Sequence, residues 1–151
     1  MASAIQHWHE SYPVVITQAV HWGDMDAFQH VNNKIYFRYF EDVRLAYLQK
    51  IGALDYMQRA HIGPVLASTR CDFRAPVQFP DMLHIATRTR DLQEKRVSMD
   101  YVVFSEQQQR VVAEGEGLIV YFDFSSQQSV AIPQQIVEEI QSLQRDSLAG
   151  R

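Results

Sequence analysis

The stretch Asn33–Ile51, with the sequence NKIYFRYFEDVRLAYLQKI, predicts an unusually apolar helix. Its apolar side chains recur mainly at intervals of three and four residues, the spacing of one helix face. They are Ile35, Tyr36, Phe37, Tyr39, Phe40, Val43, Tyr47, Leu48 and Ile51. The polar side chains form a narrow strip near Lys34, Arg38, Asp42 and Gln49. We expect a helix over residues 31–51 that stops at Gly52 and is wrapped by a curled sheet and a second subunit.

Five strand-like segments flank this helix in the sequence. One precedes it at residues 14–21, and four follow it at residues 64–74, 82–92, 97–106 and 110–122. Their apolar and polar side chains alternate, which is typical of half-buried antiparallel strands. Residues 53–63 predict a short helix or loop, and residues 132–143, with Pro133 in the first turn, predict a terminal amphipathic helix. This order predicts an α+β fold, with one antiparallel sheet against one long helix.

The alternation also predicts which side chains share a face of the sheet. In segment 82–92, Ile85, Thr87 and Thr89 alternate with a second set, which is His84, Ala86, Arg88 and Arg90. In segment 64–74, one face carries Val65, Ala67, Thr69, Cys71 and Phe73. A half-buried sheet buries one such set and exposes the other.

Length, charge and cysteine content restrict the class of protein. A chain of 151 residues suits one domain over residues 1–151, with its core at 14–124 and a tail at 125–151 that carries the terminal helix. The formal net charge of -4 argues against a nucleic-acid partner. Cys71 is the only cysteine, so no disulfide can form within the chain, which suits a reducing compartment.

The sequence gives no sign of secretion, membrane insertion or metal binding. Residues 1–12 form a polar lead without the basic and apolar regions of a signal peptide. The longest apolar run, Leu118–Phe122, is far shorter than the ~20 residues of a membrane helix. His7 and His9 lack a carboxylate or cysteine at metal-ligand spacing. We expect a cytoplasmic protein with no membrane partner and no metal.

The run HWGDMDAFQHVNN, residues 21–33, places two carboxylates just before the long helix. Asp24 follows Gly23 and suits a turn, in which its side chain bonds nearby backbone N–H groups. Asp26 has apolar neighbours and precedes a helix that we expect to be buried, so its carboxylate would be partly desolvated near the positive end of the helix dipole. Because such a group can attack a carbonyl or activate water, Asp26 is the candidate catalytic residue.

Asn32 and Asn33 lie where a helix N-cap belongs, and Asn is among the best capping residues. They cap the helix alone, or the free N–H groups at Asn33 and beyond also bind a substrate carbonyl. The two roles are compatible. His30 has three open roles: it orients the loop, donates to the substrate, or satisfies a backbone carbonyl.

These residues resemble the hotdog-fold thioesterases of the 4-hydroxybenzoyl-CoA thioesterase type, over roughly residues 14–124. The matching residues are Gly23-Asp24-Met25-Asp26, His30-Val31-Asn32-Asn33, Tyr36, Phe40-Glu41, Arg44 and Gly52, with the stretches 73–81 and 113–123. The resemblance implies a curved antiparallel sheet around a central helix. It also implies a homodimer or homotetramer with active sites between subunits and an acyl-CoA substrate.

The resemblance implies roles for single residues as well. Asp26 would attack the thioester carbonyl or activate water, and the backbone N–H of Asn33 would polarise that carbonyl. The residues of the acyl pocket or of the core would include Phe28, Tyr36 and Phe40. One departure is Gln29, where members of the family often have Gly. Its larger side chain would alter the loop or narrow the acyl pocket.

A basic cluster is the candidate site for the phosphates of coenzyme A. Arg88 and Arg90 share a strand face, and Lys95 and Arg96 lie in the adjoining turn. Guanidinium groups suit phosphate oxygens because they donate hydrogen bonds in a fork. The alternative is that the cluster is a solvated edge of the sheet.

We therefore expect an enzyme that hydrolyses an acyl-CoA thioester to a free acid and CoA, without a metal or bound cofactor. No Gly-x-Ser-x-Gly segment occurs, so nothing favours a serine hydrolase. Two alternatives stay open. A hotdog hydratase or dehydratase would use His30 on the acyl chain, and a non-catalytic module would bind acyl thioesters without cleaving them.

Overall fold

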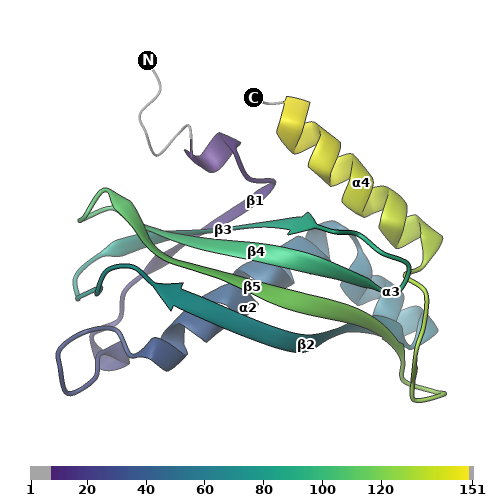
Figure 1. The fold of residues 1–151 in the computed structure, drawn as a ribbon, viewed down its shortest axis with the longest axis horizontal. Coiled ribbons are helices and arrows are strands. Elements are labelled where there is room, and N and C mark those ends of the chain that lie inside the picture. Colours follow the sequence, from purple (N-terminus) through teal and green to yellow (C-terminus); the bar gives the residue numbers. More distant parts are fainter. Residues whose placement is uncertain (1–7, 150–151) are drawn as a thin grey trace.

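The computed structural model describes residues 8–149, whose strands form one curled antiparallel sheet around a long helix (Figure 1). The strands are β1 (Val14–Ala19), β2 (Ile62–Phe73), β3 (Met82–Arg90), β4 (Arg96–Ser105), β5 (Arg110–Asp123) and β6 (Gln128–Ser129). The helices are the 3-10 turn η1 (Trp22–Asp24), α2 (Asn33–Lys50), α3 (Ala53–Ala60) and α4 (Gln134–Ala149). The predicted α+β fold is confirmed.

The long strands are ordered β1-β3-β4-β5-β2, every neighbouring pair is antiparallel, and the short β6 pairs with β5. The strands β1 and β2 are consecutive in the sequence yet lie at opposite edges of this path. The connection between them contains α2, which therefore crosses one face of the sheet. We call the face toward α2 the inner face and the opposite face the outer face.

A β-bulge in β2 overturns one predicted face. The register shifts between Leu66 and Ser68, so that Val65 pairs with Val120 whereas Thr69 pairs with Gly117. Because those two partners are an odd number of residues apart on β5, the side chains of Val65 and Thr69 point to opposite faces. The prediction of one continuous face from residue 65 to residue 73 is therefore wrong.

Helix α2 packs its aromatic stripe on the inner face. Its buried residues are Tyr36, Tyr39, Phe40, Val43, Tyr47 and Leu48. The ring of Phe40 stacks on Tyr101 of β4 with 4.7 Å between centroids. A Cβ at Gly115 of β5 would lie 2.5 Å from the Phe40 ring, so glycine is needed for this close approach. Phe37 was predicted to widen the buried stripe, but it is 38% exposed in the single chain.

The outer face is partly covered by the first described residues. The rings of Trp8 and Phe104 are 5.6 Å apart, and His9 Nε2 lies 2.6 Å from His84 Nδ1. His84 and Ala86 belong to the set that alternates with Ile85, Thr87 and Thr89 in β3, yet residues of both sets are buried. Residues 8–12 of the polar lead thus pack on the sheet, and residues 1–7 lie outside the described part.

Within residues 8–149, no helix combines the length and apolar character needed to cross a bilayer. The helix α4 lies above β3 in Figure 1, and it buries Ile136 and Ile140 in the core. This helix confirms the predicted C-terminal element, although it continues beyond the predicted end at residue 143.

Candidate active site

The loop between β1 and α2 is a closed turn around Asp26. Met25 and Val31 form an isolated antiparallel bridge. Between them, the N–H of Asp26 donates to the carbonyl of His30 (2.8 Å), and the N–H of Gln29 donates to the carbonyl of Asp26 (2.9 Å). Gln29 has a φ of 64°, in the left-handed region that glycine adopts with least strain. Gln29 therefore adopts the backbone conformation of this turn, although glycine would adopt it with less strain.

Asp24 holds this loop against α2. Its carboxylate accepts a hydrogen bond from the guanidinium of Arg38 at 2.6 Å. Its main-chain carbonyl accepts the N–H of Asn32 at 2.9 Å. These contacts support the structural role expected of Asp24, although its side chain bonds a helix arginine rather than the neighbouring backbone. The loop is therefore fixed at the start of α2 from two directions.

The Asp26 carboxylate has one engaged oxygen and one available oxygen. Oδ1 accepts the N–H of Phe28 at 2.9 Å and, more weakly, the N–H of His30 at 3.5 Å. Oδ2 accepts no hydrogen bond from residues 8–149. The side chain is half-buried, so the loop amides orient the carboxylate while Oδ2 stays open to a ligand.

The first turn of α2 likewise has an amide that makes no hydrogen bond with residues 8–149. The Asn32 side chain accepts the N–H of Lys34 at 3.1 Å, and the Asn32 carbonyl accepts the N–H of Ile35 at 2.9 Å. The N–H of Asn33 has no acceptor among residues 8–149. Because Asn33 is the first helical residue, this amide lies at the positive end of the helix dipole. The cap therefore leaves a donor suited to a carbonyl oxygen that gains negative charge.

A groove of about 430 Å³ joins these groups, and we call it the Asp26 groove. Its lining residues are Asp26, Phe28, His30, Val31, Asn33, Tyr36, Phe73, Arg74, Ala75 and Pro76. The structure thus brings together the three predicted catalytic residues and two predicted substrate-binding residues, Phe28 and Tyr36. Burial raises the pKa of the Tyr36 phenol.

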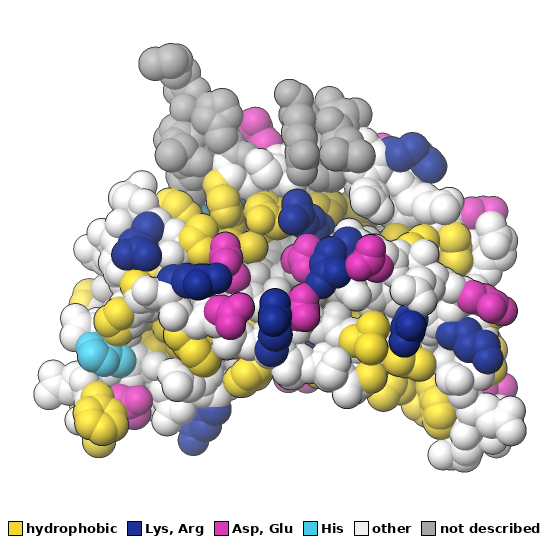
Figure 2. All heavy atoms as spheres, viewed as in Figure 1, with side chains coloured by type: hydrophobic (Ala, Val, Ile, Leu, Met, Phe, Trp, Pro, Cys, Tyr) yellow, Lys and Arg dark blue, Asp and Glu magenta, His cyan; other side chains and the backbone are white. Residues whose placement is uncertain are grey.

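The other predicted substrate-binding residues lie elsewhere in the chain. Phe40 is 1% exposed and belongs to the core. Arg88 and Arg90 lie on the outer face, where both guanidinium groups donate to Asp100 at 3.3 and 2.7 Å. Figure 2 shows basic and acidic side chains gathered together on this face.

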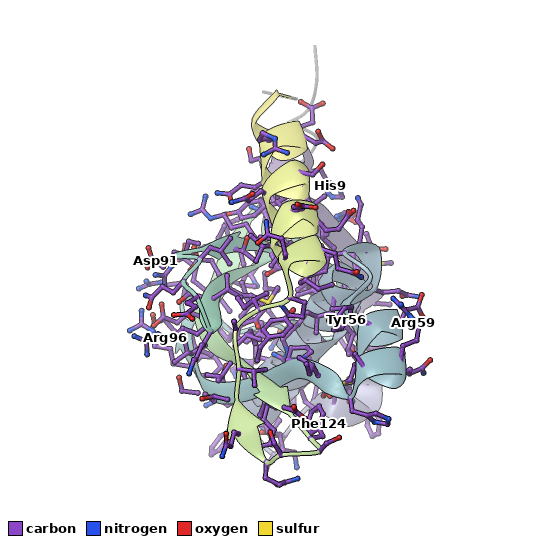
Figure 3. The ribbon with its side chains drawn as sticks, turned by 90° about the vertical axis from the view of Figure 1, so that its right-hand side faces the viewer. His9, Tyr56, Arg59, Asp91, Arg96 and Phe124 are labelled. Atoms are coloured by element: carbon purple, nitrogen blue, oxygen red, sulfur yellow. The ribbon has the colours of Figure 1, made fainter. Side chains whose placement is uncertain are left out.

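The basic residues are also far along the strand from the catalytic loop. The loop leaves the sheet next to Met82, because Ala19 pairs with Met82. At ~3.3 Å per residue, Arg88 and Arg90 lie about 20 and 26 Å from that end of β3. Arg96 lies at the opposite end of the molecule, beside Asp91 (Figure 3). Lys95 directly precedes Arg96 in the sequence. Because these four residues lie away from the catalytic loop, phosphate binding by them stays a prediction.

A second hollow adjoins the loop, and sequence analysis did not anticipate it. It has about 480 Å³ and is lined by Trp22, Gly23, Met25, Asp26, Gln29, Gln78 and Phe79. We call it the Trp22 hollow. Phe73 of the Asp26 groove was also not selected as a site residue, although it belongs to the stretch 73–81 of the family resemblance. Only the fold shows that these segments meet at the loop.

The fold and the sequence both match known proteins. Residues 20–140 match the Thioesterase-like superfamily. Among curated proteins, the chain is similar to the long-chain acyl-CoA thioesterase FadM of Escherichia coli, with 25% identity over 79% of this chain and 90% of FadM.

Solved structures show the same likeness. A Thermus thermophilus thioesterase, crystallised with coenzyme A and Zn, has a TM-score of 0.79 and 27% identity over 90% of this chain and 97% of that chain. The PA5185 protein of Pseudomonas aeruginosa has a TM-score of 0.78 and 30% identity over 89% of this chain and 94% of that chain. The hotdog fold is thereby confirmed, and the chain belongs to the Thioesterase-like superfamily of hotdog-fold enzymes.

Proposed function

We propose that this chain hydrolyses an acyl-CoA thioester to a free acid and CoA. The observation that carries the proposal is the pair of open groups in the Asp26 groove. Oδ2 of Asp26 is an available nucleophile or base, and the N–H of Asn33 is an available hydrogen-bond donor. Relatives named as acyl-CoA thioesterase and as a CoA-bound thioesterase support the substrate class.

In the proposed reaction, the thioester carbonyl oxygen accepts the N–H of Asn33, and the helix dipole favours the charge that develops there. Two routes fit the geometry. Asp26 attacks the carbonyl carbon and expels CoA thiolate, and water then cleaves the resulting anhydride. Alternatively, Asp26 takes a proton from water, which attacks the carbonyl directly. Both routes end with a carboxylic acid and CoA thiol, and neither needs a metal or bound cofactor.

The amides that hold Asp26 assist either route. The N–H groups of Phe28 and His30 fix Oδ1, so Oδ2 keeps one orientation toward the groove. In this arrangement, His30 acts on the reaction through its main chain, while its ring lines the groove.

We also propose that the enzyme is a homo-oligomer. The exposed side of α2 carries Phe37 and Leu45, which are 38% and 43% exposed. The edge strand β2 carries Val65 and Leu66, which are 39% and 38% exposed. An apolar helix face and an unpaired strand edge are features that a second copy would cover. Sedimentation velocity would test this proposal.

The test of the proposed activity replaces Asp26 by Asn, which keeps the shape of the side chain and removes its charge. We expect kcat for acyl-CoA hydrolysis to fall by about 100-fold or more. The assay measures thiol release from short, long and aromatic acyl-CoA substrates. Asp55→Asn on the exposed side of α3 is the matched control, with kcat within about twofold of the wild type. A decrease below tenfold for Asp26→Asn would remove Asp26 from the central role.

The same assay separates the alternatives. A hydratase or dehydratase would convert an enoyl thioester without releasing CoA thiol, and His30→Gln would abolish that conversion. A binding module would retain acyl-CoA affinity and show no turnover in either the wild type or Asp26→Asn. Hydrolysis with loss of activity in Asp26→Asn would support the proposal over both.

A further inference from the structure

We propose that the Trp22 hollow binds the acyl group of the thioester, and that Trp22 and Phe79 determine which acyl groups are accepted. This inference rests on the proposed function. It assigns the two sides of the catalytic loop to the two halves of the substrate. The acyl group lies in the Trp22 hollow, and CoA leaves through the Asp26 groove.

The position of Asp26 connects the two spaces. Asp26 lines both the Asp26 groove and the Trp22 hollow, whereas Asn33 lines only the groove. A thioester carbonyl held by the N–H of Asn33 therefore has its carbon near a residue that borders both spaces. The two substituents of that carbon, the acyl chain and the sulfur of CoA, must leave in different directions. The loop offers one direction on each side.

Because Asp26 borders both spaces, the charge that distinguishes them is that of Arg74. Among the residues that line the Trp22 hollow, Asp26 alone is charged, and its charge is negative. The lining of the Asp26 groove includes Arg74 as well, whose side chain is 52% exposed and pairs with Glu114 at 3.2 Å. The phosphates of CoA are attracted to a guanidinium group, which the Asp26 groove has and the lining of the Trp22 hollow lacks. A neutral acyl chain needs no such group.

The lining of the hollow combines three large apolar side chains, Trp22, Met25 and Phe79, with the polar side chains of Asp26, Gln29 and Gln78. Trp22 is 72% exposed and Phe79 is 46% exposed, and Met25 also lines the hollow. Large aromatic side chains that stay exposed around a hollow mark binding surfaces. An acyl chain that covers them is itself removed from water. Full burial stabilises a methylene by ~0.8 kcal/mol, a factor of about four, and an open hollow that covers one side of the chain would give about twofold.

The experiment measures kcat/KM for acetyl-, hexanoyl-, decanoyl- and palmitoyl-CoA. For the wild type, we expect kcat/KM to rise by about twofold per added methylene until the hollow is filled. In Trp22→Ala, Phe79→Ala and the double variant, the rise should flatten, so that decanoyl-CoA loses tenfold or more while acetyl-CoA changes by less than about threefold. Phe124→Ala is the matched control, because Phe124 is 39% exposed at the opposite end of the molecule (Figure 3).

The outcomes separate this inference from the proposed function. If no acyl-CoA is hydrolysed by the wild type, the proposed function fails. If hydrolysis occurs and Trp22→Ala, Phe79→Ala and the double variant all keep the wild-type dependence on chain length, this inference alone is overturned. An equal loss for acetyl-CoA and decanoyl-CoA also overturns it, because the two aromatic residues would then support the loop without contacting the acyl group.

Fluorescence gives a second readout that does not need turnover. The chain has two tryptophans, so Trp8→Phe leaves Trp22 as the sole tryptophan. In the Trp8→Phe, Asp26→Asn double variant, decanoyl-CoA should shift the Trp22 emission to shorter wavelength, whereas CoA alone should not. Equal shifts with CoA and decanoyl-CoA would place the CoA half in the hollow and reverse the assignment.

Discussion

Replacing Asn32 by Ala tests whether the cap of α2 also shapes the active site. The Asn32 side chain accepts the N–H of Lys34 at 3.1 Å, and its carbonyl accepts the N–H of Ile35 at 2.9 Å. Alanine keeps the second hydrogen bond and removes the first. Loss of an N-cap costs ~1 kcal/mol. For a chain of this length, that change lowers Tm by about 2–4 °C.

The same change should affect catalysis more than stability alone explains. Without the Asn32 side chain, Lys34 presents a second free amide next to Asn33, and the first turn of α2 loosens. The thioester oxygen then no longer meets a single fixed donor, so we expect kcat to fall by about tenfold, or ~1.4 kcal/mol in the transition state. Asn32→Ser retains a capping oxygen and should keep both stability and kcat near the wild-type values.

Urea unfolding and steady-state hydrolysis of decanoyl-CoA provide the two measurements. We expect both the free energy of unfolding and kcat to decrease in Asn32→Ala and to recover in Asn32→Ser. A variant that loses the expected stability while kcat stays unchanged would show that the cap does not position the oxyanion donor. An unchanged free energy of unfolding would refute the capping role itself.

Three further predictions concern packing, the loop and pH. Gly115→Ala should lower the free energy of unfolding in urea by about 1–3 kcal/mol, because its Cβ would lie 2.5 Å from an aromatic ring of α2, whereas Gly23→Ala, with nothing within 4 Å, should be nearly neutral. Gln29→Gly should raise that free energy by about 0.5 kcal/mol, because it relieves a left-handed conformation. Burial and the nearby His84 lower the pKa of His9, so the packed N-terminal segment binds fewer protons than the free segment. Its packing should therefore be strongest above pH ~6.5 and weaken as the pH falls, which the emission of Trp8 in Trp22→Phe would report.

Local patterns in the sequence predicted the elements and the centre of the candidate site. The helix follows from the spacing of its apolar residues, and its start follows from the capping preference of Asn32. Asp26 and Asn33 are close in the chain, so the turn between them brings both to one groove. These predictions succeed because the interactions that determine them act over a few residues.

Only the tertiary structure decided the contacts between distant segments. It placed Phe40 in the core, paired Arg88 and Arg90 with Asp100, and brought Phe79 to the same hollow as Trp22. The bulge in β2 and the contact between His9 and His84 also depend on segments that are far apart in the sequence. Such contacts depend on strand register and on which surfaces meet when the sheet curls, and no short stretch of sequence contains that information.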